Sequence, residues 1–161
     1  MNGPTKPKLL LRHARPEDLS EILRIFRYAI YKTCSEDYSP KQLDAWAASK
    51  KDLDRWAAMI AEQFFLVTES EGEIVGFASL KDQSHVHMMF VDPQFQQKGV
   101  AGQLLQNLED EAAKSGKSYL TVFSSHTAKP FFERMGYKII RSRQVSIRGI
   151  ELQNFEMGRW L

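Results

Sequence analysis

The sequence predicts a mixed α/β fold in which helices cover a β-sheet. Three observations support this: helical apolar periodicity in the first third, short β-rich runs in the middle, and a strand–helix–strand order towards the end. A length of 161 residues fits one domain with a core of its own. We therefore expect a single domain over residues 9–161, preceded by a flexible leader over residues 1–8.

Composition excludes several classes of protein. Lys and Arg number 22 against 20 Asp and Glu, and no basic run stands out, so we expect neither a nucleic-acid partner nor a membrane partner. Apolar runs are far too short for a membrane span, and no secretory signal is visible. The single cysteine, Cys34, excludes an intrachain disulfide and CxxC metal motifs. We expect a soluble, cytoplasmic protein without a metal.

The first third of the chain predicts a short strand and three helices. The strand covers residues 9–14, and the first helix begins at Pro16 and fades near residue 33. Ser39, followed by Pro40 and by Gln42, is a capping signal for a second helix that runs to about residue 48. Asp52 begins a third helix, which ends near residue 62 and carries an apolar face.

The rest of the chain alternates β-rich runs with two helices. Turn residues separate the runs, and Glu71-Gly72 and Arg148-Gly149 predict hairpins. The expected strands are 64–70, 74–81, 85–91, 119–124, 137–145 and 150–160. A regular apolar stripe predicts a helix over 99–115, and a shorter helix is expected over 128–135; each is followed by a glycine.

The segment that follows the strand at 85–91 predicts an anion site. A strand ends at Asp92-Pro93, and a helix then opens on Gly99. Its first amides have no partner within the helix and lie at the positive end of the helix dipole. Gly99 and Gly102 let a phosphate approach the backbone, and Lys98 adds a positive charge. The Walker and dinucleotide glycine patterns are both absent from the chain.

The same segment resembles the acyl-CoA signature of the GNAT acetyltransferase superfamily, [RQ]-x-x-G-x-[GA], here Gln96-x-x-Gly99-x-Ala101. The downstream segment Phe131-Phe-Glu-Arg-Met-Gly-Tyr137 is similar to the family's F-Y-E-K-x-G-F segment. The resemblance implies a mostly antiparallel, twisted sheet with a central splayed parallel strand pair, flanked by helices. It implies acetyl-CoA as co-substrate, bound by Phe90, Val91, Gln96, Gln97, Lys98, Gly99, Val100, Ala101, Gly102, Ser125 and Phe132.

His85 and His87 lie two residues apart on one predicted strand and therefore face the same side of the sheet. Two imidazoles without a third ligand make a weak metal site, and such a pair is also common as a polar patch. The resemblance instead implies that they act as general base in an N-acetyltransferase, taking a proton from a primary amine that attacks the thioester directly in a ternary complex. It also implies that the Met89 amide stabilises the oxygen that gains charge.

The chain departs from the family pattern on the acid side. Phe132 stands where many members have a tyrosine that protonates the leaving thiolate, and Ser125 stands where asparagine is common. The thiolate then leaves unprotonated, or water, Ser125 or His126 assists. This departure keeps a second reading open, a non-enzymatic acyl-CoA-binding or regulatory module. O-acetyl transfer at the same coenzyme site is a third.

The resemblance implies that the first two helices and their loop form the acceptor pocket. Aromatic residues there, among them Tyr31, Tyr38 and Trp46, suit an amine with an apolar part, either a small molecule or a peptide. Helical spacing makes a core role the more common reading for Trp46. The last hairpin, which includes Phe155, Met157 and Trp160, is a candidate surface for pairing with a second copy into a homodimer.

Overall fold

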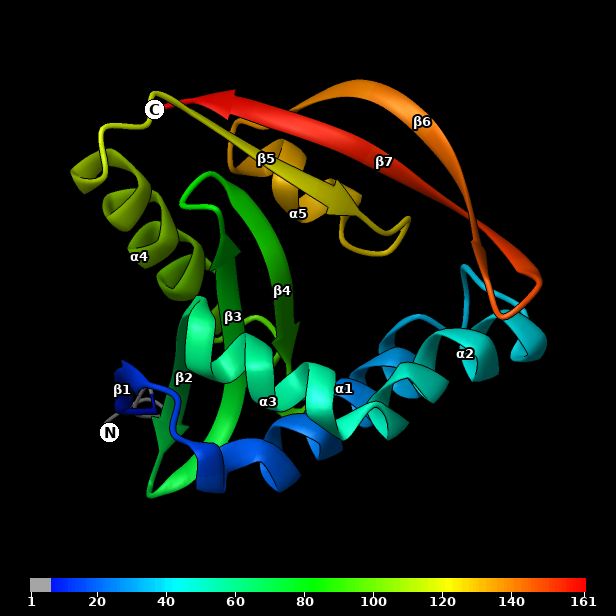
Figure 1. Cartoon of the computed structure of the whole chain (residues 1–161), viewed down its shortest axis with the longest axis horizontal. Helices are drawn as coiled ribbons and strands as arrows, with labels where there is room; N and C mark the ends of the chain where they lie inside the picture. Colours follow the sequence, from blue (N-terminus) through cyan, green and yellow to red (C-terminus); the bar gives the residue numbers. More distant parts are fainter. Residues whose placement is uncertain (1–6) are drawn as a thin grey trace, which may run out of the picture.

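The computed structural model describes residues 7–161, so residues 1–6 of the predicted leader lie outside the described part. Its centre is a seven-stranded sheet in the order β1-β2-β3-β4-β5-β7-β6 (Figure 1). The strands are β1 (Leu9–His13), β2 (Phe64–Ser70), β3 (Glu73–Lys81), β4 (His85–Val91), β5 (Tyr119–Ser124), β6 (Lys138–Ile147) and β7 (Ile150–Trp160). Every predicted strand is present, and β6 runs two residues further than expected.

Helices cover both faces of the sheet. They are α1 (Leu19–Thr33), α2 (Pro40–Ala47), α3 (Leu53–Glu62), α4 (Val100–Lys114) and α5 (Lys129–Arg134). The apolar faces of α1, α2 and α3 share one core cluster with β2 and β3, and those of α4 and α5 share a second cluster on the other face (Figure 1). The mixed α/β architecture predicted from the sequence is therefore confirmed.

Local capping sets where the helices begin. Ser39 accepts a hydrogen bond from the Gln42 amide at 3.3 Å, and the Gln42 side chain bonds back to the Ser39 amide, so the predicted capping box is present. The first helix opens with a 3-10 turn (Pro16–Asp18) rather than an α-helical one. A second 3-10 segment (Ala48–Lys51) follows α2, which ends one residue earlier than expected.

The strand pairing is antiparallel throughout, except between β4 and β5. These two strands are parallel and pair only through His85 with Thr121 and Val86 with Val122. Beyond this point they diverge towards their carboxyl ends (Figure 1). The mostly antiparallel sheet with a splayed parallel pair is confirmed, and the divergence opens a gap in the middle of the sheet.

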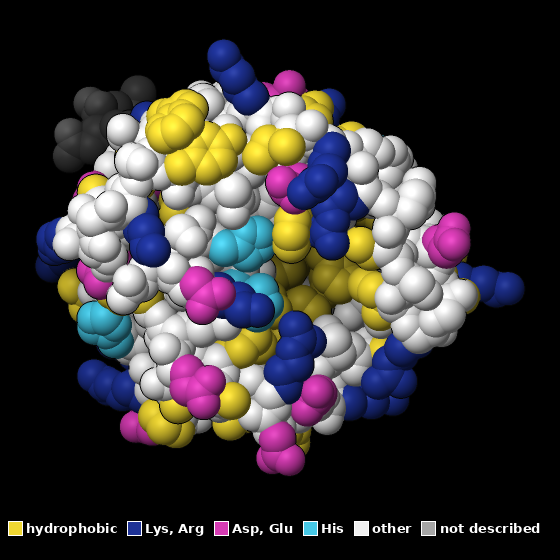
Figure 2. All heavy atoms as spheres, turned by 45° about the horizontal axis from the view of Figure 1, so that its top comes forward, with side chains coloured by type: hydrophobic (Ala, Val, Ile, Leu, Met, Phe, Trp, Pro, Cys, Tyr) yellow, Lys and Arg dark blue, Asp and Glu magenta, His cyan; other side chains and the backbone are white. Residues whose placement is uncertain are grey.

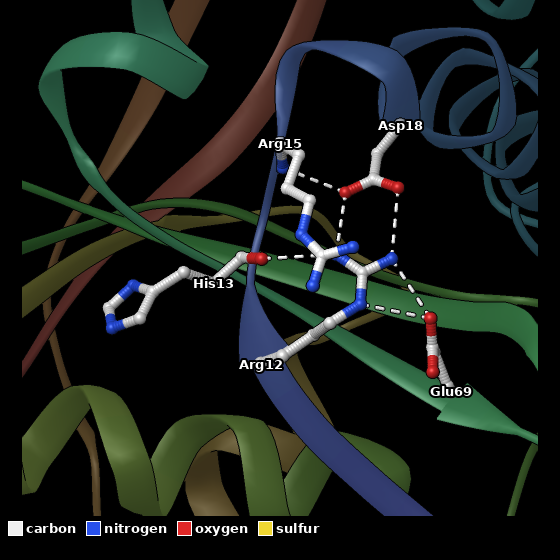
Figure 3. Close-up of polar contacts among 5 residues, drawn as sticks. All are labelled: Arg12, His13, Arg15, Asp18 and Glu69. Atoms are coloured by element: carbon white, nitrogen blue, oxygen red, sulfur yellow. Dashed lines mark hydrogen bonds and ion pairs between the residues drawn. The ribbon is translucent and has the colours of Figure 1, made fainter.

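Arg12 on β1 fixes the start of the first helix against the sheet edge (Figure 3). Its guanidinium donates to both oxygens of Asp18, at 2.7 and 2.9 Å, and to Glu69 of β2 at 2.9 Å. The Arg15 amide also donates to Asp18 at 2.7 Å. The Arg12 guanidinium therefore lowers the pKa of the Asp18 carboxyl, against the opposing effect of burial. This ion-pair cluster joins β1, β2 and the 3-10 turn.

The last hairpin presents only part of the surface proposed for a second copy. Met157 is fully buried and belongs to the core, and Phe155 is half-buried. Trp160 is 73% exposed and packs its ring edge-on against Tyr119. Of the three residues, only Trp160 is therefore free to contact another chain.

In residues 7–161, no helix combines the length and apolarity needed to cross a membrane.

Candidate active site

A cavity of about 600 Å³ lies where β4 and β5 diverge. Its walls come from both diverging strands, the start of α4, the helix α5 and the facing parts of α1 and α2. Figure 2 shows a hollow with an apolar interior, with histidine side chains beside it and Lys and Arg side chains around its mouth. Of the predicted site residues, the cavity brings together Trp46, His87, Met89, Phe90, Val91, Gln96, Gln97, Gly99, Val100, Ala101, Gly102, Ser125 and Phe132.

The start of α4 presents open backbone donors to this cavity. Gln97 and Gly99 adopt left-handed conformations, with φ of 59° and 84°, which turn the chain sharply into the helix. Gly99 occupies the N-cap position of α4, and in the described residues no capping side chain accepts a hydrogen bond from the first amides of the helix. A Cβ built on Gly99 or Gly102 meets no atom within 4 Å, so neither glycine is needed for internal packing. The helix terminus therefore fits a diphosphate, as the sequence predicts.

Lys98 differs from its neighbours in this loop. Its side chain is exposed and does not line the cavity, because the left-handed residues on either side turn it outwards. Arg134 of α5 lines the cavity instead. Among residues 7–161, it is the one Lys or Arg side chain in the cavity lining.

The backbone of β4 aims donors and acceptors into the gap. The Asp92 amide donates to the Val75 carbonyl of β3 at 2.8 Å. Because backbone groups alternate in direction along a strand, the N–H and C=O groups of Met89 and Val91 point away from β3, towards the gap. The Gln96 side chain donates to the Val91 carbonyl at 3.3 Å. The Met89 and Val91 amides are thus directed into the cavity.

His85 is held at the first of the two residue pairs between β4 and β5. Its Nδ1 lies 2.7 Å from the Thr121 hydroxyl, and its ring packs 4.5 Å from the Phe123 ring, centroid to centroid. Burial lowers the pKa of His85, and the positive charges of Lys81 and Arg143 lower it further. The imidazole is therefore neutral at pH 7, with Nε2 free of the Thr121 contact. His85 adjoins the cavity through Phe123 rather than lining it.

His87 occupies a β-bulge that the sequence did not indicate. Leu80 pairs with Val86 and Ser79 with Met88, so His87 is an additional residue on β4 and projects into the cavity wall. Its Nδ1 lies 2.9 Å from the amide nitrogen of Gln63 and 3.2 Å from the oxygen of the same side chain. With the ring proton on Nδ1, the imidazole donates to that oxygen and Nε2 carries the free lone pair. Burial, followed by the charges of Arg55, Lys81 and His85, lowers the pKa of His87 from 6.5 to about 4. The ring is therefore neutral at pH 7, and Gln63 fixes its orientation.

Within residues 7–161, no tyrosine lines the cavity, and Phe132 lines it on the α5 side. That side chain is buried and packs edge-on against Tyr137 at 5.4 Å. The Ser125 hydroxyl accepts the Ala128 amide at 3.1 Å and so caps the turn into α5. His126 is engaged by Gln153, whose Oε1 lies 2.8 Å from its Nε2. In residues 7–161, no three His, Cys, Asp or Glu side chains gather as a metal site would require.

The aromatic residues predicted for the acceptor divide into two groups. Trp46 lines the cavity. Tyr38 is 7% exposed, and its hydroxyl accepts the His126 amide at 3.0 Å and donates to the Gln153 carbonyl at 2.9 Å, so it braces the wall from behind. Tyr31 donates to Asp44 at 2.6 Å and lies outside the cavity. Neither tyrosine reaches the cavity, since both are used in structural contacts.

Four residues beside the predicted site were not singled out by the sequence analysis. Gln63 and Thr121 contact the two histidines, Phe123 lines the cavity, and Arg143 stacks on the Phe123 ring. The register of β4 with β5 places Thr121 beside His85, whereas Gln63 comes from the end of α3 and Arg143 from β6. No local pattern in the sequence encodes these contacts.

Comparison with known proteins agrees with this geometry. A family model described as an acetyltransferase (GNAT) domain matches residues 34–158. The uncharacterized N-acetyltransferase YafP of Escherichia coli is 39% identical over 91% of this chain and 93% of its own length. A GCN5-related N-acetyltransferase from Rhodopseudomonas palustris superposes with a TM-score of 0.93 at 36% identity, covering 98% and 97% of the two chains. The fold also matches that of a PaiA N-acetyltransferase from Thermoplasma acidophilum, crystallised with coenzyme A, with a TM-score of 0.79, 17% identity and 96% and 99% coverage.

Proposed function

The chain belongs to the GNAT acetyltransferase family of acyl-CoA-dependent enzymes, and from this premise we propose that it moves the acetyl group of acetyl-CoA to a primary amine. The amine attacks the thioester directly, with both substrates bound together. The observation that carries the proposal is the convergence on one cavity of open helix-terminal amides, strand amides and a neutral histidine, His87. These are the parts that the transfer needs, on a single continuous surface.

Acetyl-CoA supplies an activated acyl group in its thioester. We assign the diphosphate to the amides at the start of α4, where Gly99 and Gly102 leave room. The pantetheine arm lies along the gap beside β4 and meets the outward-facing amide of Val91. Arg134 of α5 offers a positive charge to the phosphates. The proposal includes the predicted coenzyme residues other than Lys98, which is exposed and does not line the cavity.

The acceptor amine must lose a proton before it can attack, because an alkyl ammonium has a pKa near ~10.4. His85 and His87 are neutral at pH 7. When Nδ1 carries the ring proton and donates it to the Thr121 hydroxyl or to the Gln63 side-chain oxygen, Nε2 can accept the proton of the amine directly or through a water. Met89 donates its amide to the oxygen that gains charge as the amine adds. No protein acid is needed for the leaving thiolate, since a thiol pKa near ~8.5 makes it an adequate leaving group.

The proposal is tested by mixing the purified protein with acetyl-CoA and a panel of amines. We expect thiol release that depends on the amine, with a mass increase of one acetyl group on nitrogen. Replacing His85 or His87 by alanine should lower kcat by about 10²–10⁴ with little change in coenzyme affinity. His13→Ala is the matched control, because His13 lies on β1, packed against Phe64. Coenzyme binding without thiol release from any amine would refute the proposal, and acetyl transfer to hydroxyl groups would redirect it.

A further inference from the structure

Arg143 of β6 lies at the mouth of the cavity, stacked on an aromatic ring. Its guanidinium carbon is 3.6 Å from the centroid of the Phe123 ring, and Phe123 lines the cavity. Phe123 also packs against His85, whose ring centroid is 4.5 Å away. Arg143 is half-buried and, among the residues that the structure describes, forms no ion pair with a carboxylate. A guanidinium fixed in this way keeps its donors available.

The carboxylate nearest to the Arg143 guanidinium in the sheet register is that of Glu156, which already pairs with Arg141. Glu156 of β7 lies opposite both Phe123 and Arg141, so the three side chains share one face of the sheet. Arg141 donates to both oxygens of Glu156, at 3.0 to 3.3 Å, and balances its charge. Arg143 is therefore not neutralised from within the protein.

The remaining charges around the histidine pair are mostly positive. The charges of Arg55 and Lys81 lower the pKa of His87, and those of Lys81 and Arg143 lower the pKa of His85. Two carboxylates, Glu156 and Asp82, act on His85 in the opposite direction. Figure 2 shows basic side chains gathered at the mouth of the hollow, above its apolar interior. An acceptor that approaches the histidines meets a positive potential, which attracts anionic groups and repels a second ammonium.

We propose that the acceptor is a free amino acid or a similar small amine with a neighbouring carboxylate, and that Arg143 binds this carboxylate. The inference rests on the proposed amine acetylation. Arginine presents a planar pair of donors that matches a carboxylate, and stacking on Phe123 orients it beforehand. The amine is then directed to His85 and His87, and an apolar side chain has room beside Trp46 in the cavity.

The positive rim also serves the reaction itself. A cationic environment disfavours the protonated amine, so it shifts the bound acceptor towards the neutral, nucleophilic form. Polyamines and lysine-rich peptides carry additional positive charge and meet repulsion in the same place. The site thus selects zwitterionic acceptors by both attraction and exclusion.

The experiment compares each of the common amino acids with its carboxamide and its decarboxylated amine, using acetyl-CoA and the wild-type protein. The carboxamide has the less basic amine, so without carboxylate recognition it reacts faster at neutral pH. We expect the amino acid to exceed both analogues in kcat/KM for at least one side chain. Arg143→Gln should raise the KM for that amino acid by about 10- to 100-fold, remove the preference for the acid over its two analogues, and leave the KM for acetyl-CoA unchanged. Arg143→Lys should restore part of the preference for the acid.

Lys138→Gln is the matched control, because it removes one positive charge from the exposed start of the same strand. Carboxamides or simple amines that react as well as the acids would overturn the inference while amine acetylation stands. A rise in the KM for acetyl-CoA in Arg143→Gln would also overturn it, since it would assign the charge to the coenzyme. Failure to acetylate any amine would overturn both proposals.

Discussion

His85 and Thr121 lie 2.7 Å apart, Nδ1 to hydroxyl, at one of the two residue pairs that join β4 to β5. The same pair therefore closes the parallel seam of the sheet and orients a candidate base. Thr121 touches no reacting group in the proposed mechanism, so its role is to position His85.

Thr121→Val tests this positioning role, because valine keeps the shape and strand propensity of threonine without the hydroxyl. Loss of one hydrogen bond is worth about 1 kcal/mol, so kcat should fall about fivefold to tenfold. Thr121→Ser keeps the hydroxyl and should restore the rate. The pH profile of kcat should change in the valine variant alone, whereas identical profiles for both variants would leave Thr121 a purely structural residue.

Gly102→Glu separates coenzyme binding from folding. The new side chain has open space, and a glutamate in the first turn of α4 favours the helix, so the free energy of unfolding should rise by about 1 kcal/mol. Its bulk and negative charge stand where we assign the diphosphate, so calorimetry with coenzyme A should detect no binding. Gln103→Glu adds the same charge on an exposed side of the helix and should bind normally. Normal binding by Gly102→Glu would move the diphosphate away from α4.

His87 should titrate well below an ordinary histidine. Burial and the charges of Arg55, Lys81 and His85 bring its pKa to about 4 in the folded protein, against 6.5 unfolded. The unfolded chain therefore binds the extra proton between these values, so stability is full above pH 6.5 and declines as pH falls towards 4. NMR titration of the imidazole protons gives the midpoint directly. In Arg55→Gln the midpoint should rise; a wild-type midpoint near 6.5 would contradict the buried environment.

Asp18→Asn should weaken the ion-pair cluster around Arg12 without affecting the active site. The change removes the charge that pairs with the guanidinium inside a mostly buried contact, at a cost of about 1–3 kcal/mol in the free energy of unfolding. Arg12 lowers the pKa of Asp18, so the wild-type protein should lose this contribution only as pH falls below 3.8, the ordinary value, through the folded pKa. Denaturant unfolding at pH 7 and pH 3 measures both effects, and Glu17→Gln is the exposed control. Equal stability of the two variants at pH 7 would make the cluster incidental.

The sequence was sufficient for the elements and for the turn that opens α4 on Gly99, because both depend on local signals. The capping box at Ser39, the glycines at 99 and 102, and the hairpin turns act within a few residues of themselves. The acceptor side was predicted less well. Tyr38 was expected to contact the acceptor, yet its hydroxyl is used by His126 and Gln153, which are distant in the chain.

The histidine environment illustrates the same limit. The pair at His85 and His87 is visible as a motif, but its low basicity depends on burial by distant elements and on charges from β6 and α3. The bulge that holds His87 is a property of the β3–β4 register. Register and burial are set by the packing of the whole sheet, and no window of the sequence contains them.

The two-pair seam between β4 and β5 has a mechanical consequence. It leaves β1–β4 and β5–β7 joined within the sheet by two residue pairs, so the rigidity between the two halves depends on the helices packed across both and on whatever fills the gap. A coenzyme that bonds to the exposed edge of β4 would act as a surrogate strand, and part of its binding free energy would be expressed as slower amide exchange across the whole protein.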